Sequence, residues 1–283
     1  MNIIITGHKG LIGSSLKKRL EKEGHNIVNS IDMREGKNIL DLKDKYIDEK
    51  VDILFHLAAH CKINQSITNP DTSHINDANG TFAVLEFCRK NNIKKIVNFS
   101  SSRVISTEKN PYTAAKLYGE ELCKAYKDCY NINYIIIRPS TVYGPFDDKT
   151  HRLMDIFIRN SLNGDGLVIF GDPETKTLDF SYIDDFIEGI MLAINGPWNN
   201  EYDISGGEEF NVYELARLII QKVSSKSKII ISAPEIAQPQ KIKLDLKKIK
   251  ALGYVPKISL EKGVNKCIDF YKELLKVNLS QIN

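Results

Sequence analysis

The chain has 283 residues, of which 42% are hydrophobic and 27% charged, a balance typical of globular enzymes rather than disordered or fibrous proteins. Its formal net charge of +3 argues against a protein built to bind a nucleic-acid backbone. No apolar run is long enough for a transmembrane helix, and the N-terminus shows no signal-peptide pattern. We therefore expect a cytoplasmic protein with neither a nucleic acid nor a membrane as a partner.

The five cysteines are an odd number, and they form no C-x-x-C pair and no metal-ligand spacing with histidine. A disulfide framework and a structural metal site are therefore not expected. We interpret the cysteines as buried free thiols, and we predict no metal site in the chain.

The first ~140 residues alternate between short apolar runs and longer helical patterns. The apolar runs predict strands at 2–6, 26–32, 52–58, 95–100 and 134–138, buried on both faces. The helical patterns lie near 11–23, 73–91 and 112–129. This alternation is typical of βαβ units, and it predicts an α/β fold with a doubly wound parallel sheet.

Beyond about residue 141 the pattern changes, and glycines and aspartates separate shorter strands at 168–170, 202–205 and 229–232. Helices are expected near 184–194, 211–224 and 260–276. We interpret this part as a smaller C-terminal α/β lobe over the carboxyl edge of the sheet. The predicted domains are 1–141 and 142–283, with the chain crossing back between the two lobes.

A glycine-rich turn joins the first predicted strand to the first helix. Gly7 permits the tight turn, Gly10 lets a pyrophosphate approach the backbone, and Gly13 allows close packing of helix on strand. The helix N-terminus adds free N–H groups and the positive end of its dipole. The spacing is one residue longer than G-x-G-x-x-G, but the strand before it and the helix after it predict dinucleotide binding by domain 1–141.

Asp32, at the end of the second predicted strand, favours NAD as the dinucleotide. A carboxylate there accepts hydrogen bonds from the ribose hydroxyls and repels a 2′-phosphate. Lys9 and Arg34 are nearby cations that could hold such a phosphate, so NADP is the alternative.

Tyr112 and Lys116 are four residues apart on the third predicted helix, and therefore share one face. A neighbouring ammonium stabilises a phenolate and lowers the pKa of tyrosine from its reference value of about 10. The tyrosine can then exchange a proton with a sugar hydroxyl or ketone while hydride moves to or from nicotinamide. A serine at the preceding strand end can orient the same oxygen. We assign this role to Ser102, with Ser100 and Ser101 as alternatives.

The chain resembles the extended short-chain dehydrogenases/reductases, within the NAD-dependent epimerase/dehydratase family that modifies nucleotide sugars. The resemblance covers nearly the whole length, and its segments are TGHKGLIG (6–13), DL (41–42), HLAA (56–59), DANGT (77–81), YTAAK (112–116), RPSTVYGP (138–145), LDFSYIDD (178–185) and LGYVP (252–256). It implies a Rossmann-type fold, a nucleotide-sugar substrate, and a homodimer through the helices near 73–91 and 112–129.

The resemblance also assigns site residues. In the reaction, Tyr112 is the proton donor and acceptor, Lys116 tunes it and binds the nicotinamide ribose, and Ser102 positions the carbonyl oxygen. The substrate-binding residues are Ser102, Thr141 and Arg152. The cofactor-binding residues are Gly7, Gly10, Leu11, Ile12, Gly13, Asp32, Met33, Asp41, Leu42, Leu57, Ala58, Ala59, Ser100, Tyr112, Lys116 and Pro139.

Departures from the family pattern reduce the number of family reactions that this chain is expected to catalyse. Dehydratases and decarboxylases carry acidic residues just after the catalytic serine or threonine, whereas Arg103 follows Ser102 here. The loop between Ser102 and Tyr112 is short, which suggests an open pocket. Thr141 and Leu178 replace the family's Asn and Arg, which removes usual diphosphate contacts, and Asp77 replaces an Asn.

These departures leave redox chemistry at C4 of the sugar. We lean to a 4-keto-sugar reductase, because an epimerase must retain its keto intermediate and favours an enclosed site. The alternative is a 4-epimerase with tightly bound NAD. A 4,6-dehydratase and a non-catalytic NAD(P)-binding sensor are further alternatives.

Overall fold

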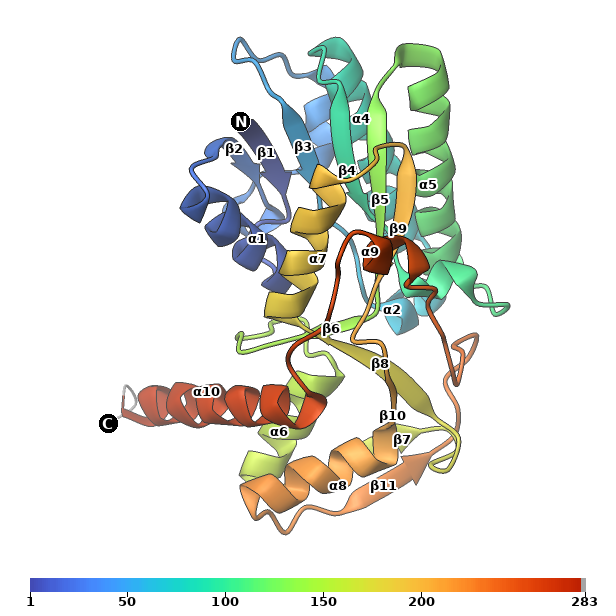
Figure 1. Cartoon of the computed structure of the whole chain (residues 1–283). Helices are drawn as coiled ribbons and strands as arrows, with labels where there is room; N and C mark the ends of the chain where they lie inside the picture. Colours follow the sequence, from blue (N-terminus) through green and yellow to red (C-terminus); the bar gives the residue numbers. More distant parts are fainter. Residues whose placement is uncertain (281–283) are drawn as a thin grey trace.

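A six-stranded parallel sheet organises the larger part of the molecule in the computed structural model, which describes residues 1–280 (Figure 1). The strand order is β2-β1-β3-β4-β5-β9. The strands are β1 (Asn2–Thr6), β2 (Asn26–Ile31), β3 (Ile53–His56), β4 (Lys95–Phe99), β5 (Asn133–Pro139) and β9 (Asn200–Ile204).

Helices cover both faces of this sheet. One face carries α1 (Leu11–Lys22) and α7 (Ile183–Asn195), and the other carries α4 (Gly80–Lys90) and α5 (Pro111–Tyr130). Two short helical segments, α3 (Asp71–Ser73) and the π-helical η3 (His74–Asn79), lead directly into α4. The remaining short segments are η1 (Met33–Glu35), η2 (Ile39–Asp44), α2 (Ile63–Thr68) and η4 (Ser102–Ile105).

Successive residues of each central strand enter different cores, because side chains alternate between the faces of a sheet. Ile3 and Ile5 of β1 are buried in the core under α1 and α7. Ile4, between them, is buried in the core under α4 and α5. The uninterrupted apolar runs of the sequence therefore belong to strands covered on both faces, and the predicted doubly wound α/β fold is confirmed.

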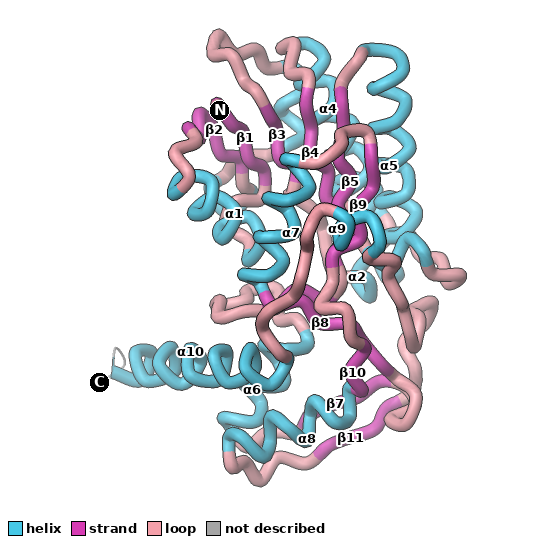
Figure 2. The backbone as a smooth tube through the Cα atoms, in the orientation of Figure 1, coloured by secondary structure: helices cyan, strands magenta, loops and turns pink. Residues whose placement is uncertain are grey.

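A smaller lobe lies at the carboxyl edge of the sheet (Figure 2). It contains a three-stranded sheet of order β10-β8-β6 and a parallel pair, β7 with β11. Its strands are β6 (Thr141–Tyr143), β7 (Leu167–Phe170), β8 (Thr177–Tyr182), β10 (Glu209–Asn211) and β11 (Ile229–Ser232). Its helices are α6 (Leu153–Asn163), α8 (Val212–Val223) and α10 (Leu260–Ser280), while α9 (Lys247–Ala251) packs near β9.

The second half of the chain contributes more to the large sheet than the sequence analysis assigned to it. The strand predicted at 202–205 is β9, which pairs in parallel with β5 rather than within the small lobe. The helix predicted at 184–194 is α7, which packs against α1. The physical reason is burial: Tyr202 and Ile204 of β9 are covered by the apolar face of α7 and complete the edge beside β5.

One other expectation, the burial of the cysteines, changes in part. Cys88, Cys123 and Cys267 are buried free thiols, as predicted, but Cys61 and Cys129 are exposed. They lie on surface segments, Cys61 in the loop after β3 and Cys129 in the last turn of α5. None of the helices within residues 1–280 combines the length and the apolar character that membrane spanning requires.

His56, the last residue of β3, joins three elements at the edge of the large sheet. Its Nδ1 lies 2.9 Å from Oγ1 of Thr6 in β1, and its Nε2 lies 3.3 Å from Oγ1 of Thr81 in α4. Burial lowers the pKa of His56 from 6.5 to about 3, and the charge of Lys116 adds to this effect. The folded protein therefore keeps this imidazole neutral.

The neutral His56 predicts a loss of stability in mild acid. Below pH 6.5 the unfolded chain binds a proton at this histidine that the folded chain does not, so the free energy of unfolding falls as the pH falls towards 3. One such proton contributes a slope of about 1.4 kcal/mol per pH unit. Urea unfolding of His56→Gln between about pH 4.5 and 6 should show a slope smaller than wild type by this amount.

The control for this experiment is His74→Gln, which replaces an exposed histidine. It should keep the wild-type slope. Equal slopes for wild type and His56→Gln would show that His56 is not a neutral buried group.

Candidate active site and dinucleotide cleft

The carboxyl ends of the parallel strands open into a cavity of about 490 Å³. This is the position at which open α/β sheets bind ligands. The cavity is lined by the turn after β1, by residues that follow β3, β4 and β5, by the start of α5, and by the segment 146–152 before α6. In the described part of the chain, no cluster of His, Cys, Asp or Glu side chains is arranged to hold a metal ion.

The glycine turn (residues 7–13) has no room for side chains at two of its positions. A Cβ on Gly7 would lie 2.6 Å from the backbone N of Ala58, and Gly7 has a φ of +75°. A Cβ on Gly13 would overlap the carbonyl oxygen of Gly7. Gly10 lines the cavity as the N-cap of α1, and no side chain caps this helix. The N–H groups of the first helical turn therefore stay free for a pyrophosphate, so the turn fits a bound dinucleotide.

The carboxylate of Asp32 is buried beside this turn and is held by backbone N–H groups. Its Oδ2 accepts from Lys9 N and its Oδ1 from Arg34 N, each at 2.9 Å. The two cations have other partners: Lys9 Nζ lies 2.8 Å from Glu35 Oε1, and Arg34 Nη1 donates to the Lys9 carbonyl at 2.7 Å. Two carboxylates next to the expected ribose position disfavour a 2′-phosphate, which fits NAD rather than NADP.

Tyr112 and Lys116 lie on the first two turns of α5, and both are buried at the cavity wall. A capping box fixes the start of this helix: Asn110 Oδ1 accepts from Thr113 N, and Thr113 Oγ1 accepts from Asn110 N, both at 3.0 Å. Lys116 Nζ donates to the carbonyl of Phe99 at 3.1 Å, and it lies 5.9 Å from the centre of the Tyr112 ring.

Burial is the main influence on the Tyr112 phenol, and it raises the pKa above the ordinary value. The side chain of Ser101 lowers the pKa, the negative charge of Asp77 raises it, and the positive charge of Arg103 lowers it. The decrease that the sequence analysis expected from Lys116 is therefore not found. Lys116 is shared with the carboxylate of Asp77, whose Oδ1 lies 3.8 Å from its Nζ.

The three adjacent serines after β4 have different surroundings. The hydroxyl of Ser100 donates to the buried Glu120 at 2.5 Å, so it is already engaged. Ser101 has extended backbone, its Oγ accepts from the backbone N of Arg103 at 3.2 Å, and its side chain lowers the pKa of the Tyr112 phenol. At Ser102 the chain turns into η4, and this residue lines the cavity without a hydrogen bond to Tyr112. Ser101, the last extended residue beyond β4, and Ser102 therefore both line the cavity, and Ser101 is the serine whose side chain acts on the Tyr112 phenol.

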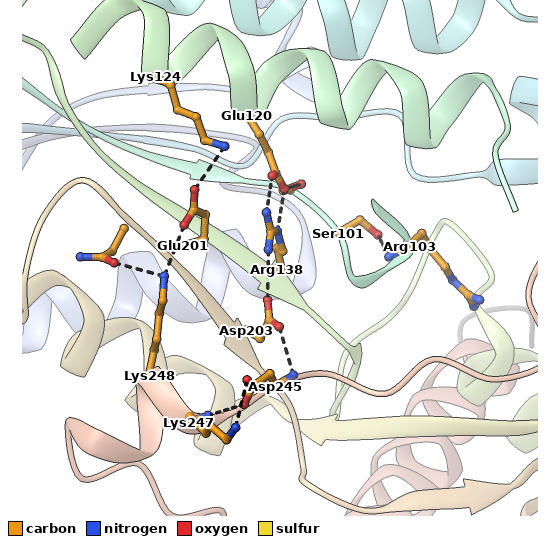
Figure 3. A network of polar contacts seen from close by, with 12 residues as sticks. Ser101, Arg103, Glu120, Lys124, Arg138, Glu201, Asp203, Asp245, Lys247 and Lys248 are labelled. Atoms are coloured by element: carbon orange, nitrogen blue, oxygen red, sulfur yellow. Dashed lines mark hydrogen bonds and ion pairs between the residues drawn. The ribbon is translucent and has the colours of Figure 1, made fainter. Parts of the chain in front are cut away.

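The Glu120 cluster, formed by Glu120, Arg138 and Asp203, fixes α5 against the sheet (Figure 3). Glu120 accepts two hydrogen bonds from the guanidinium of Arg138, at 2.8 and 2.5 Å. Arg138 Nη1 in turn lies 3.8 Å from Oδ1 of Asp203 in β9. Tyr112, Lys116 and Glu120 follow one another at intervals of four residues, so the cluster holds the helix face that carries the reactive side chains.

Asp77 is a second buried carboxylate beside Lys116. Its Oδ1 accepts from His60 N at 2.8 Å, whereas its Oδ2 is buried and has no hydrogen-bond partner among the residues described. Burial raises the pKa of Asp77, and the charge of Lys116 opposes this increase. Because an Asn is expected here from the family resemblance, Asp77 adds an ionisable group to the surroundings of Lys116.

The structure brings the predicted site residues to the cavity, with two exceptions. Leu42 is buried in the core beneath α4 and Asp41 is exposed, so neither lines the cavity. Arg152 lines it and pairs with Asp148 at 2.7 Å. Several lining residues received no role from the sequence, although some lie inside or next to the matched segments: Cys61, Ile63, Phe99, Arg103, Ser140, Val142, Phe146, Asp148 and Thr150.

The tight glycine turn predicts that Gly7→Ala weakens NAD binding about tenfold or more, because the new methyl group displaces the backbone at Ala58. Gly24→Ala is the matched control. Gly24 has a φ of +80°, but a Cβ there would have no atom within 4 Å, so this variant shares the backbone strain of about 1–2 kcal/mol without the overlap. Calorimetric titration with NAD measures both. Equal affinities would argue against the proposed role of this turn.

Two solved structures resemble the whole chain closely. The UDP-glucose 4-epimerase of Thermotoga maritima, crystallised with UDP-glucose, is 25% identical with a TM-score of 0.88, and the match covers 97% of this chain and 100% of that one. The UDP-glucuronic acid 4-epimerase of Bacillus cereus, in complex with UDP-glucuronic acid and NAD, is 25% identical with a TM-score of 0.87 and covers 97% and 100% of the two chains.

Sequence comparison gives the same grouping. The putative UDP-glucose 4-epimerase of Methanocaldococcus jannaschii is 31% identical over an alignment of 302 residues. The alignment covers 95% of this chain and 98% of the relative. A model of the NAD dependent epimerase/dehydratase family matches residues 3–212. The predicted family and its cofactor, NAD, are thereby confirmed: the chain belongs to the NAD-dependent epimerase/dehydratase family.

Proposed function

We propose that the chain is a nucleotide-sugar 4-epimerase that keeps NAD bound through the reaction. The observation that carries the proposal is the arrangement of Tyr112, Ser101 and Lys116 at the wall of a cleft suited to a dinucleotide. The names of the relatives support the same reaction and favour a UDP-linked sugar. They support epimerisation rather than the keto-reduction to which the sequence analysis leaned.

In this proposal Tyr112 removes the proton of the sugar O4 and returns it after the ring has presented its other face. NAD, when bound, supplies the acceptor and donor of hydride at C4. Ser101 hydrogen-bonds the same oxygen, and Lys116 holds the nicotinamide ribose and stabilises the phenolate. Thr141 and Arg152, which also line the cavity, are proposed to contact the diphosphate.

Contacts beside the cavity weaken the argument that favoured a reductase. That argument relied on an open pocket, because the loop before Tyr112 is short. The segment 235–238 of the small lobe instead bonds to elements beside the cavity: Glu235 Oε1 accepts from Asn64 Nδ2 at 2.6 Å, and the carbonyl of Ala237 accepts from Asn110 Nδ2 at 3.0 Å. These contacts tie the small lobe to elements beside the cavity, which supports an enzyme that must retain a keto intermediate.

The test is to incubate the purified protein, without added cofactor, with UDP-glucose and with UDP-glucuronate, and to separate the products by chromatography. We expect the C4 epimer of at least one, and stoichiometric NAD(H) released on denaturation. Tyr112→Phe should lose at least about 100-fold in kcat, because it lacks the acid/base group, while its NAD content stays unchanged.

Other outcomes identify the alternatives. A protein that is purified empty and consumes NADH with a 4-keto sugar is a reductase. A 4-keto-6-deoxy product indicates a dehydratase. Bound NAD without any turnover, and without an effect of Tyr112→Phe, indicates a sensor.

We also propose that the enzyme is a homodimer through the faces of η3, α4 and α5 that are turned away from the sheet. Ile75, Phe82, Tyr118 and Tyr130 lie on these segments, and each exposes at least 40% of its surface. Exposed apolar side chains that gather on adjacent helices are typical of protein–protein interfaces. The family resemblance expects the same pair of helices in the interface.

Introducing charge into this surface should therefore produce monomers. In light scattering coupled to size-exclusion chromatography, the double variant Phe82→Glu/Tyr118→Glu should have the mass of one chain and wild type that of two. Tyr46→Glu is the control, because Tyr46 is an exposed aromatic residue outside these helices. A monomeric wild type would refute the proposal.

A further inference from the structure

Arg103 differs from every other arginine of the chain in having no partner for its side chain among the described residues. The chain has eight arginines. Each of the others donates to a carboxylate or a carbonyl, as found for Arg19, Arg34, Arg89, Arg138, Arg152, Arg159 and Arg217. Arg103 contributes only its backbone N–H, to Ser101 Oγ at 3.2 Å, and its Nη1 is buried without an acceptor.

The unpaired guanidinium lies at the cavity, close to the reactive tyrosine. Arg103 lines the cavity together with Tyr112, and its charge acts on that phenol. In Figure 3 its side chain points away from the Glu120 cluster. Arg103 is half-buried, and its fully buried Nη1 is costly without an acceptor, because it loses the hydrogen bonds that water would supply. The guanidinium of Arg103 can therefore bind an anionic group of a ligand in the cavity.

The charge of Glu235 acts on Arg103, but the carboxylate of Glu235 is engaged elsewhere. Its Oε1 accepts from Asn64 and its Oε2 lies 3.6 Å from Lys176 Nζ. No ion pair joins Glu235 to Arg103 within residues 1–280. The carboxylate thus balances Lys176 and leaves Arg103 free for the ligand.

The chemistry of a nucleotide sugar limits what this anion can be. In the proposed reaction Tyr112 acts on O4, so C4 lies beside the tyrosine. The diphosphate is attached to C1, which is opposite C4 across the ring, whereas C6 is carried by C5, the direct neighbour of C4. The proposed diphosphate contacts, Thr141 and Arg152, also line a second small cavity that Arg103 does not reach. An arginine beside Tyr112 is thus placed for the substituent at C6.

We propose that Arg103 binds a carboxylate at C6, so that the substrate class is a nucleotide-linked hexuronate. This inference rests on the proposed 4-epimerase function and specifies its substrate. The planar guanidinium presents a pair of parallel donors that match the two oxygens of a carboxylate. A neutral hydroxymethyl group at C6 offers no such match and leaves the buried charge uncompensated.

The experiment compares kcat/KM for UDP-glucuronate and UDP-glucose in wild type, Arg103→Gln and Arg152→Gln. Wild type should prefer UDP-glucuronate by about tenfold or more. Arg103→Gln should lose at least about tenfold more with UDP-glucuronate than with UDP-glucose, because only the uronate loses a charge partner, whereas the altered surroundings of Tyr112 affect both substrates alike. Arg152→Gln is the matched control, since it should affect both substrates by the same factor. NAD content and Tm verify that the variants are folded.

A wild type that prefers UDP-glucose, or an Arg103→Gln variant that loses both activities equally, would overturn the inference. If neither sugar is epimerised, the proposed function fails, and calorimetric binding then decides the inference separately. Tighter binding of UDP-glucuronate than UDP-glucose, lost in Arg103→Gln, would support the assignment of Arg103. Equal binding of the two ligands by wild type would refute it.

Discussion

A buried carboxylate, that of Glu120, is the constraint on which the geometry of the site depends. Its hydrogen bonds from Ser100 and Arg138 tie α5 to the ends of β4 and β5. Arg138 extends the connection to Asp203 in β9, whose Oδ2 accepts from the backbone N of Asp245, before α9. Removing one partner of such a pair costs about 3–5 kcal/mol, because the other charge is left buried alone. One cluster thus aligns the reactive helix face, the last strand of the sheet and the chain that returns from the small lobe.

The large sheet could be predicted because strands buried on both faces appear in the sequence as unbroken apolar runs. The limits of β1 agree with the prediction residue for residue. The small lobe was harder, because β6 and β10 contain only three residues each, too few to show a period. The pairing of β9 with β5 could not be predicted either, because parallel pairing between strands far apart in the chain produces no local sequence pattern.

In the site, too, the features set by residue spacing could be predicted, whereas those set by the surroundings of a side chain could not. The pair Tyr112 and Lys116 and the glycine turn follow from fixed spacings, which a helix and a tight turn translate directly into geometry. The choice among adjacent serines did not follow, because it depends on the residue at which β4 gives way to η4. The raised pKa of Tyr112 and the unpaired state of Arg103 depend on burial and on distant partners, which a sequence does not display.

The late arrival of β9 has a consequence for how the chain folds during synthesis. Strand β5 is complete at Pro139, but the strand that pairs with its outer edge begins only at Asn200. Until that segment leaves the ribosome, an almost wholly apolar strand has an unpaired edge, the form of backbone that invites pairing with other chains. The period in which this edge is unpaired therefore lasts through the synthesis of most of the small lobe. Chaperone binding to nascent chains should concentrate in this interval.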